Sequence, residues 1–343
     1  MASIVLNNGR KIADGEFPYI IAEMGTNHAG NMDKVFEMID AAKEAGCDCV
    51  KFQSWTTDSL YSKCVYEKNP IAKRFVTKFS LSEEELKVAF EYCCKVGIDF
   101  SSTPYSKSEV DFLVDEVNAP FVKVASMDLN NYPFLQYIAK KNVPIILATG
   151  MSDIEEIEKA VEVIRETGND RLCLLHCISI YPPQMNTVNL SNINGLRKRF
   201  GEYPIGLSDH TLGTEIASAS ITMGTAVIEK HLTLDKSRMG WDNDMAMEPW
   251  EMKQMIEACH NVYDALGTET RVVYEAELQQ RENIRRSIVS ARDLKAGDVL
   301  AMEDMDVKRP GTGIKPEMMK ELVGRTVNRD ISRDELIMYE DLM

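Results

Sequence analysis

Several features that define whole classes of protein are missing from this 343-residue chain. Basic residues are in the minority: 39 Lys and Arg stand against 54 Asp and Glu, a net charge of −15, which argues against nucleic acid and anionic membranes as partners. No apolar run approaches the roughly 18 residues of a membrane span, and residues 1–11 lack the charged start and long apolar core of a signal peptide. We therefore expect a cytoplasmic protein.

Cysteine is scarce, and the common glycine motifs are missing. The eight cysteines lie mostly in apolar segments without C-x₂-C spacing, which indicates buried thiols in a reducing compartment and disfavours a structural zinc. Neither G-x-G-x-x-G nor G-x₄-G-K-[ST] occurs, so a nucleotide cradle is disfavoured. With 44% hydrophobic and 27% charged residues, the composition is that of an ordinary globular protein and excludes collagen, a disordered tail and a coiled coil.

Eight short apolar runs dominate the first ~265 residues, and longer stretches of helical period separate them. Some of these stretches follow an N-cap residue and a cluster of acids, as at Ser82 and Ser152. The eight repeats favour a TIM (β/α)₈ barrel, with a doubly wound open sheet as the alternative, because counting strands does not establish closure. The runs cover residues 19–25, 49–53, 99–103, 121–126, 144–149, 172–177, 204–210 and 226–233. This βα unit is the only internal repeat that we identify.

The pattern changes after Arg281. Residues 284–343 combine short β-like pieces with Gly-rich turns and show little helical period. We predict a barrel domain over 1–270, a polar linker over 271–283 and a small β-rich domain over 284–343. A piece of about 60 residues is marginal as an independent core, so we expect this domain to lean on something larger.

Polar side chains gather where the predicted strands end, and a TIM barrel keeps its active site at those ends. Three pairs of these side chains are two residues apart and therefore share a face of their strand. The pairs are Lys51 and Gln53, Ser208 and His210, and Glu229 and His231. Any one of these residues could be part of a structural ion pair, and His176 is the weakest candidate because it could only brace the backbone. Their convergence nevertheless favours a functional site, since buried charges are costly. The candidates are Glu23, Lys51, Gln53, Thr103, Lys123, Ser126, His176, Ser208, His210, Glu229 and His231.

Two kinds of binding are indicated by these residue types. His210 and His231 form a candidate two-imidazole metal pair with open positions, and the nearby carboxylates and hydroxyls suit Mn²⁺ or Mg²⁺. Lys51 and Lys123 form a candidate anion cradle, helped by serine hydroxyls and loop amides. A metal-dependent barrel hydrolase or isomerase is the alternative, but it would have little use for the two lysines.

Ten short motifs occur in the order in which the N-acetylneuraminate (sialic acid) synthase family, with its legionaminate and pseudaminate relatives, carries them. The chain resembles this family over nearly its whole length. The motifs are residues 23–31 (EMGTNHAGN), 50–53 (VKFQ), 102–104 (STP), 123–126 (KVAS), 149–151 (TGM), 176–182 (HCISIYP), 206–213 (GLSDHTLG), 229–235 (EKHLTLD), 285–289 (RRSIV) and 308–314 (KRPGTGI). In the family, a C-terminal antifreeze-like (SAF) domain follows the barrel, which fits residues 284–343. A non-catalytic sugar- or ice-binding protein is a further alternative, but it leaves the charges at the strand ends unexplained.

The resemblance implies condensation of phosphoenolpyruvate with an open-chain N-acetylated hexosamine such as N-acetylmannosamine, giving a nine-carbon 2-keto acid and phosphate. Glu23, Gln53 and Glu229 would surround the reacting centre. His210 and His231 would bind a divalent metal, Mn²⁺ first and Mg²⁺ or Co²⁺ as alternatives. Asn69, Asp242 and Arg309 would face the sugar, the last from a domain-swapped homodimer in which the small domain completes its partner's site. The residues implied for phosphoenolpyruvate are Lys51, Thr103, Lys123, Ser126, Tyr181 and Ser208.

The chain departs from the family pattern at two places. Family members commonly have Pro-Asp-His-Lys where this chain has Trp241, Asp242, Asn243 and Asp244, and an Asn where it has Ser179. The loss of a cationic His-Lys pair makes this loop more acidic. We therefore predict a neutral or amino-bearing acceptor rather than an anionic one, and a modified 2-acetamido sugar in preference to N-acetylmannosamine.

Overall fold

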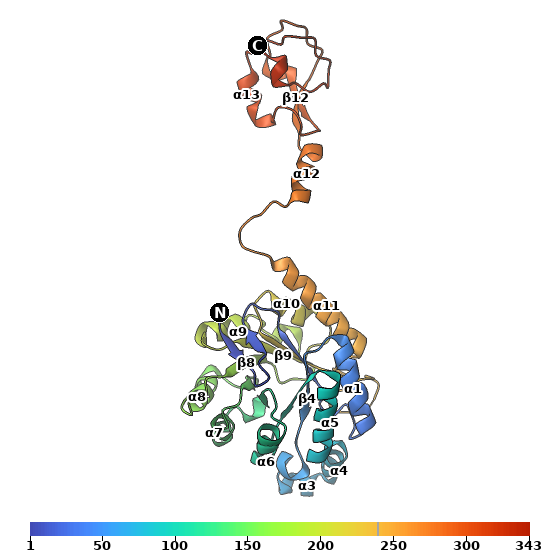
Figure 1. Cartoon of the computed structure of the whole chain (residues 1–343), viewed down its shortest axis with the longest axis vertical. Coiled ribbons are helices and arrows are strands. Elements are labelled where there is room, and N and C mark those ends of the chain that lie inside the picture. Colours follow the sequence, from blue (N-terminus) through green and yellow to red (C-terminus); the bar gives the residue numbers. More distant parts are fainter. Residues whose placement is uncertain (239) are drawn as a thin grey trace. The chain divides into compact units, whose positions relative to one another are not determined.

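The computed structural model describes residues 1–238 and 240–343, which form two compact units, Met1–Gly267 and Thr268–Met343. The first unit is a nearly closed barrel of eight parallel strands, which confirms the predicted fold (Figure 1). All eight predicted runs form strands: β3 Tyr19–Glu23, β4 Cys49–Gln53, β5 Asp99–Thr103, β6 Val122–Val124, β7 Ile145–Ala148, β8 Leu172–Cys177, β9 Ile205–Asp209 and β10 Val227–His231.

The ladder of backbone hydrogen bonds around the barrel is interrupted between β5 and β6, a place that we call the seam. Hydrogen-bonded neighbours follow the order β5-β4-β3-β10-β9-β8-β7-β6, so β5 and β6 stand at the two ends of this order. These two strands contact each other, and the Ser101 hydroxyl donates a hydrogen bond of 2.8 Å to the Phe121 carbonyl across the contact. Side chains therefore bridge the barrel where the backbone ladder is interrupted.

Strand register places the candidate side chains side by side. Glu23 of β3 lies opposite Lys51 of β4 and His231 of β10, and Glu229 of β10 lies opposite Ser208 of β9. The residues between them alternate to the other side of their strands. There the buried Lys230 forms a 2.7 Å ion pair with Asp209 and also donates to the Thr211 carbonyl.

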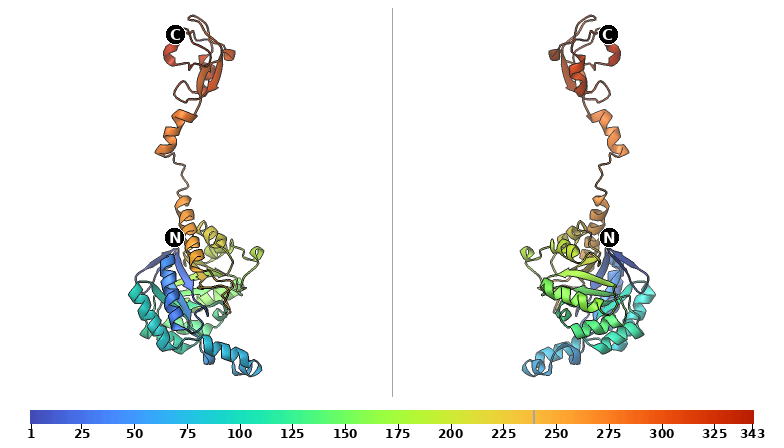
Figure 2. Two further views of the ribbon diagram at one scale, coloured as in Figure 1. Left: turned by 90° about the vertical axis from the view of Figure 1, so that its right-hand side faces the viewer. Right: turned by 90° about the vertical axis from the view of Figure 1, so that its left-hand side faces the viewer.

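Helices surround the sheet in two groups (Figures 1 and 2). The half formed by β3, β4, β5 and β10 packs against α1 Met32–Ala45, α5 Glu83–Val96, α10 Glu215–Ile221 and α11 Pro249–Leu266. The half formed by β6 to β9 packs against α6 Lys107–Asp111, α7 Tyr132–Lys140, α8 Ile154–Arg165 and α9 Asn192–Arg199. Ser82 caps α5 as predicted, but α8 is capped by Asp153 rather than Ser152, because the Asp153 carboxylate accepts from the Glu156 amide.

The two ends of the barrel differ. At the amino ends of the strands, the hairpin of β1 Ser3–Val5 and β2 Lys11–Ala13 contributes Ile4, Leu6 and Ile12 to the core inside the barrel. Three short helices follow β4 and project from the opposite end (light blue in Figure 2): α2 Thr57–Leu60, α3 Lys63–Lys68 and α4 Pro70–Phe79. Throughout the described ranges, no helix combines the length and the apolar character needed to cross a membrane.

The second unit begins with a helix where a linker was predicted. α12 spans Glu275–Ile284 and has no buried residue, and its Glu-Ala-Glu-Leu-Gln-Gln-Arg sequence consists of strong helix formers. Beyond it, β11 Ser287–Ser290 pairs with β12 Met305–Lys308, and the short helix α13 spans Met319–Leu322. Apolar residues such as Ile288, Leu300 and Ile337 form a core of the unit's own.

This unit also contains a repeat that the sequence analysis missed. Arg292 forms an ion pair of 2.6 Å with Asp304, whose carboxylate accepts from the Ala301 amide. Arg329 forms the same pair with Asp341 at 2.5 Å, and Asp341 accepts from the Met338 amide. Since 329 − 292 and 341 − 304 both equal 37, two half-domains of related sequence build this unit, and the βα unit is not the only repeat.

Candidate active site

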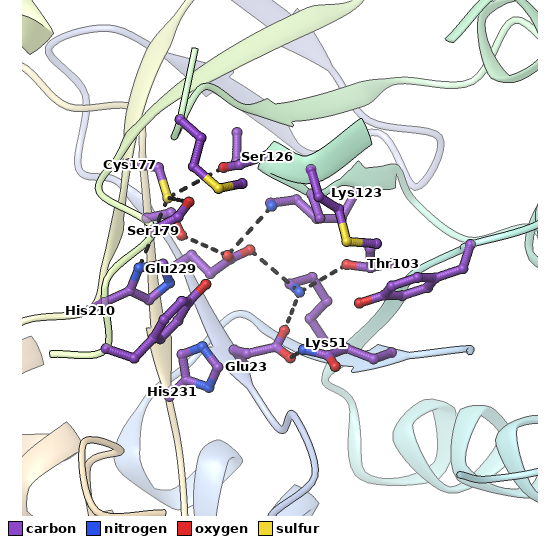
Figure 3. Close-up of a pocket in the computed structure, with 18 residues that line it drawn as sticks. Glu23, Lys51, Thr103, Lys123, Ser126, Cys177, Ser179, His210, Glu229 and His231 are labelled. Atoms are coloured by element: carbon purple, nitrogen blue, oxygen red, sulfur yellow. Dashed lines mark hydrogen bonds and ion pairs between the residues drawn. The ribbon is translucent and has the colours of Figure 1, made fainter. Parts of the chain in front are cut away.

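A pocket of about 240 Å³ lies at the carboxyl ends of the barrel strands (Figure 3). All eight barrel strands, β3 to β10, or the loops that follow them, supply its side chains. The structure therefore brings together eleven of the fourteen site residues that the sequence predicted. These are Glu23, Lys51, Gln53, Thr103, Lys123, Ser126, Tyr181, Ser208, His210, Glu229 and His231.

Lys51 lies at the centre of a buried ionic cluster, between two carboxylates (Figure 3). Its ammonium pairs with Glu23, lies 3.8 Å from Glu229 Oε2 and donates to the Thr103 hydroxyl at 3.1 Å. Burial lowers the pKa of Lys51, but the two carboxylates outweigh this effect, so the net pKa is raised and the side chain stays charged. Lys51 thus presents a fixed positive charge to the pocket.

Lys123 provides a second positive charge next to the same carboxylate. Its ammonium lies 3.6 Å from Glu229 Oε1, and that oxygen also accepts a 2.9 Å hydrogen bond from Ser208. Burial lowers the pKa of Lys123. The two ammonium groups therefore face one pocket with Glu229 between them, which is the arrangement expected of an anion cradle.

The two glutamates have different protonation behaviour. Burial raises the pKa of Glu23, against the opposing effect of Lys51. Burial acts on Glu229 as well, but Lys123, Lys51 and the Ser208 hydroxyl outweigh it and lower its pKa to about 2. The surroundings therefore favour the ionised form of Glu229 more strongly than that of Glu23, which makes Glu23 the better candidate for proton transfer.

Glu23 is held in place by its neighbours. Its Oε1 accepts hydrogen bonds of 2.9 Å from the Gly25 amide and from Gln53 Nε2. Gln53 is oriented in turn, because its Oε1 accepts from the Trp55 indole at 2.9 Å. Gln53 therefore contacts Glu23 and fixes its carboxylate.

His210 and His231 lie with ring centroids 5.5 Å apart, and the ring of Tyr181 packs 4.2 Å from His210. The Nδ1 of His210 is 2.8 Å from the Ile178 carbonyl, which can only accept, so Nδ1 carries the proton and Nε2 has a free lone pair. Burial, reinforced by His210, holds the pKa of His231 well below its ordinary value, and His231 Nδ1 is buried without a hydrogen-bond partner in the described ranges. Burial lowers the pKa of His210 as well, but Cys177 and the Ile178 carbonyl outweigh this effect, so the net pKa is raised. In their neutral forms, the two imidazoles would each offer a nitrogen lone pair that suits a divalent metal.

In the described ranges, His210 and His231 are not part of a larger cluster of metal-ligating side chains. In the described part of the chain, no group of three or more His, Cys, Asp or Glu side chains is arranged to hold a metal ion.

Cys177 and Ser179 line the pocket although the sequence analysis did not select them as site residues. The Cys177 sulfur is 3.6 Å from the Ser126 hydroxyl and 4.0 Å from His210 Nδ1. Burial raises the pKa of Cys177, but these two partners outweigh it and lower the pKa to about 7. The position of Cys177 at the end of a predicted strand was the available signal. His176, the weakest candidate, braces the backbone instead, with Nε2 2.7 Å from the Val188 carbonyl.

Three predicted sugar residues do not line this pocket. Asn69 is exposed and caps α4, accepting from the Ala72 amide, and Arg309 is exposed in the second unit. Asp242 lies at its edge, with Oδ2 3.8 Å from His231 Nδ1, and burial raises its pKa to about 6.

The loop after β10 contains the residues on which the specificity prediction rests. Asn243 is buried and donates to the Arg238 carbonyl at 3.0 Å, so it serves the loop itself, and Asp244 is exposed; neither lines the pocket. The negative charge of Asp244 acts on its neighbour Asp242, whose pKa it raises in addition to the effect of burial.

Comparison with known proteins shows the family to which the chain belongs. Residues 38–271 match the NeuB family, and residues 285–343 match the SAF domain. The N,N'-diacetyllegionaminic acid synthase of Legionella pneumophila is 36% identical over 337 residues, 94% of each chain, and the N-acetylneuraminate-9-phosphate synthase of Homo sapiens is 33% identical over 95% of this chain and 93% of its own. The structure of an N-acetylneuraminic acid synthetase from Leptospira borgpetersenii, in complex with citrate, superposes with a TM-score of 0.74 at 30% identity, over 81% of this chain and 94% of that one. The chain, with its barrel and its C-terminal SAF domain, therefore belongs to the NeuB family.

Proposed function

We propose that this enzyme condenses phosphoenolpyruvate with the open-chain form of an N-acetylated hexosamine, forming a nine-carbon 2-keto acid and inorganic phosphate. The observation that carries the proposal is the pair of buried lysines, Lys51 and Lys123, facing one pocket from neighbouring parts of the barrel. Phosphoenolpyruvate carries a carboxylate and a phosphate, and such a multiply charged anion needs several charged and hydroxyl donors. Thr103, Ser126 and Ser208 supply hydroxyls in the same pocket.

The charge of the cluster explains why a cation would assist this binding. Lys51 and Lys123 contribute +2, and Glu23 and Glu229 contribute −2 when both are ionised, so the four groups sum to zero. An incoming anion therefore gains from an additional positive charge. We propose that His210 and His231 hold a divalent metal, Mn²⁺ in the first place and Mg²⁺ or Co²⁺ as alternatives, which when bound polarises the sugar aldehyde.

The reaction forms one carbon–carbon bond and releases one phosphate. C3 of phosphoenolpyruvate attacks the aldehyde carbon, water adds at C2, and the tetrahedral intermediate collapses with cleavage of the C2–O bond to phosphate. Lys51, Lys123 and the hydroxyls hold the phosphoenolpyruvate. Glu23, positioned by Gln53, is placed to transfer a proton to or from the reacting groups, and Glu229 fixes the two lysines.

The proposal also specifies which sugar is the preferred acceptor. A similar chain is named as an N,N'-diacetyllegionaminic acid synthase at 36% identity, and the loop at Trp241 lacks the cationic His-Lys pair. We infer a neutral hexose with two N-acetyl groups as the preferred acceptor, bound near Asn69 and Asp242. The chain acts in the cytoplasm as a homodimer whose exchanged SAF domains present Arg309 to the partner's site.

The test is mass spectrometry of products from phosphoenolpyruvate, Mn²⁺ and a sugar panel. The panel contains N-acetylmannosamine, its 6-phosphate and a 2,4-diacetamido hexose. We expect a new 2-keto acid and an equal amount of phosphate, with the diacetamido sugar the best acceptor. A panel led by N-acetylmannosamine or its phosphate would refute the acceptor. Stable phosphoenolpyruvate with every sugar would refute the function and leave the barrel hydrolase or isomerase as the alternative.

A further inference from the structure

Three aromatic side chains connect two loops beside the pocket. The ring of Trp241, in the loop after β10, stacks on Phe75 of α4 with centroids 4.4 Å apart and planes inclined by 25°. Trp55, which follows β4, lies 5.8 Å from the same indole. We call Trp55, Phe75 and Trp241 the aromatic clamp.

The aromatic clamp packs on a small hydrophobic core. Trp55 is 2% exposed and packs with Val76 and Phe79 in a small core, and Phe75 stacks on Phe79 at 4.0 Å. Trp241 itself is 42% exposed, so its indole covers this core from outside. An aromatic stack of this kind stabilises a specific geometry and not merely burial.

The two segments joined by the clamp carry the two residues of the barrel unit assigned to the acceptor. Asn69 caps the helix α4 that contains Phe75, and Asp242 directly follows Trp241. The far end of the Asp242 loop is fixed to β10, because the Met247 amide donates to the His231 carbonyl at 2.8 Å. Within the loop, the Asp242 carbonyl accepts from the Ala246 amide at 3.0 Å. Trp241 fixes the near end.

The room around Asp242 is restricted. A side-chain carbon on Gly25 would come within 2.9 Å of Asp242 Oδ2 and 3.4 Å of His231 Nδ1. The Asp242 carboxylate thus lies between His231 of β10 and Gly25, which follows β3.

The clamp also reaches the reacting centre. The Trp55 indole donates to Gln53, and Gln53 donates to Glu23, each at 2.9 Å. Trp241 therefore packs against the first member of a chain of contacts that ends at the carboxylate assigned to proton transfer.

We propose that Trp241 is a positioning residue for the acceptor sugar: its stacking on Phe75 and Trp55 sets the distance between Asn69 and Asp242 and thereby selects the acceptor. This inference rests on the proposed function. It places the departure from Pro-Asp-His-Lys in the indole of Trp241, since Asn243 is used inside the loop and Asp244 faces solvent.

The experiment compares three variants of the full-length enzyme. Trp241→Ala removes the clamp, Trp241→Phe keeps an aromatic ring, and Trp250→Ala is the matched control. Trp250 is 57% exposed at the start of α11 and donates to Glu248, outside the clamp. The readouts are the KM and kcat for the diacetamido sugar, the Kd of phosphoenolpyruvate, and hydrogen exchange of the Ala246 amide, which requires no substrate.

For Trp241→Ala we expect kcat/KM for the acceptor to fall by about 10- to 100-fold, the loss typical of a group displaced by about 1 Å. The Kd of phosphoenolpyruvate should stay within about twofold, and the Ala246 amide should exchange faster. Trp241→Phe should recover most of both effects, and Trp250→Ala should match wild type. Unchanged Ala246 exchange in Trp241→Ala, or equal losses for both substrates, would overturn the clamp. If wild type turns over no sugar, the proposed function fails, while the exchange data still decide whether Trp241 fixes the loop.

Discussion

Replacing Lys123 by Met tests the anion cradle most directly. The ammonium of Lys123 is buried and lies 3.6 Å from Glu229 Oε1. Two unit charges at such a distance interact by about 5 kcal/mol at an effective dielectric of ~20. A bound phosphate or carboxylate would lose a contact of this order. Truncation of one partner of a buried charge pair costs about 2–5 kcal/mol, which corresponds to roughly 30- to 5,000-fold weaker binding.

The assay is titration calorimetry of phosphoenolpyruvate, together with the KM of the acceptor at saturating phosphoenolpyruvate. The fold should survive, because Glu229 keeps its hydrogen bond from Ser208 and its contact with Lys51. Lys159→Met is the matched control, since Lys159 lies on the exposed face of α8 and pairs with Glu162. If Lys123→Met weakened both substrates equally, the reasoning would be refuted.

Three further predictions concern the metal, the acid sensitivity of the fold and the proposed dimer. His231→Ala should abolish turnover and the calorimetric binding of Mn²⁺ while leaving the thermal midpoint near that of wild type. Burial lowers the pKa of His28 from 6.5 to about 4, so between these values the unfolded chain binds a proton that the folded chain does not; stability should fall by roughly 3 kcal/mol as pH drops through this window, and His28→Asn should flatten the dependence in urea titrations. A mixture of Arg309→Ala and His231→Ala chains should recover about a quarter to a half of wild-type activity, because one hybrid site in each heterodimer regains both residues.

Each of these has a result that contradicts it. Full activity in excess chelator would show that the reaction needs no metal. It would then contradict the role of His231 as a metal ligand. An unchanged slope of stability against pH in His28→Asn would show that other groups cause the acid sensitivity. Proven heterodimers without recovered activity would mean that Arg309 serves its own barrel or no site.

Much of the pocket could be predicted because it depends on simple periodicity. Residues two apart on a strand share a face, and parallel strands present their carboxyl ends together, so Lys51 and Gln53, or Glu229 and His231, had to meet. Loops follow no such rule. That Trp241 stacks on Phe75 while Asn243 turns inward depends on contacts between distant parts of the chain, which no local pattern contains.

The prediction missed other features for different reasons. The 37-residue repeat of the SAF domain is short and interrupted in the sequence, where Arg-Asp-Leu at 292–294 matches Arg-Asp-Ile at 329–331 and Glu-Asp at 303–304 matches Glu-Asp at 340–341. The two Arg–Asp ion pairs make it evident. Cys177 was expected to be a buried apolar residue, and it is buried. Its contact with His210, which follows a different strand, changes its chemistry.

The seam between β5 and β6 gives the pocket a mechanical asymmetry. Thr103 is the last residue of β5, and Lys123 lies on β6. Two of the predicted phosphoenolpyruvate residues are therefore on opposite sides of the seam. Their separation can change without breaking a backbone hydrogen bond between strands, although it would strain the hydrogen bond from the Ser101 hydroxyl to the Phe121 carbonyl. Glu23, Glu229 and His231 sit on β3 and β10, which are paired along five residues and form the stiff wall of the barrel. A ligand bound between Thr103 and Lys123 would thus contact the side of the barrel that can deform more easily. The side that carries Glu23, Glu229 and His231 would keep its geometry.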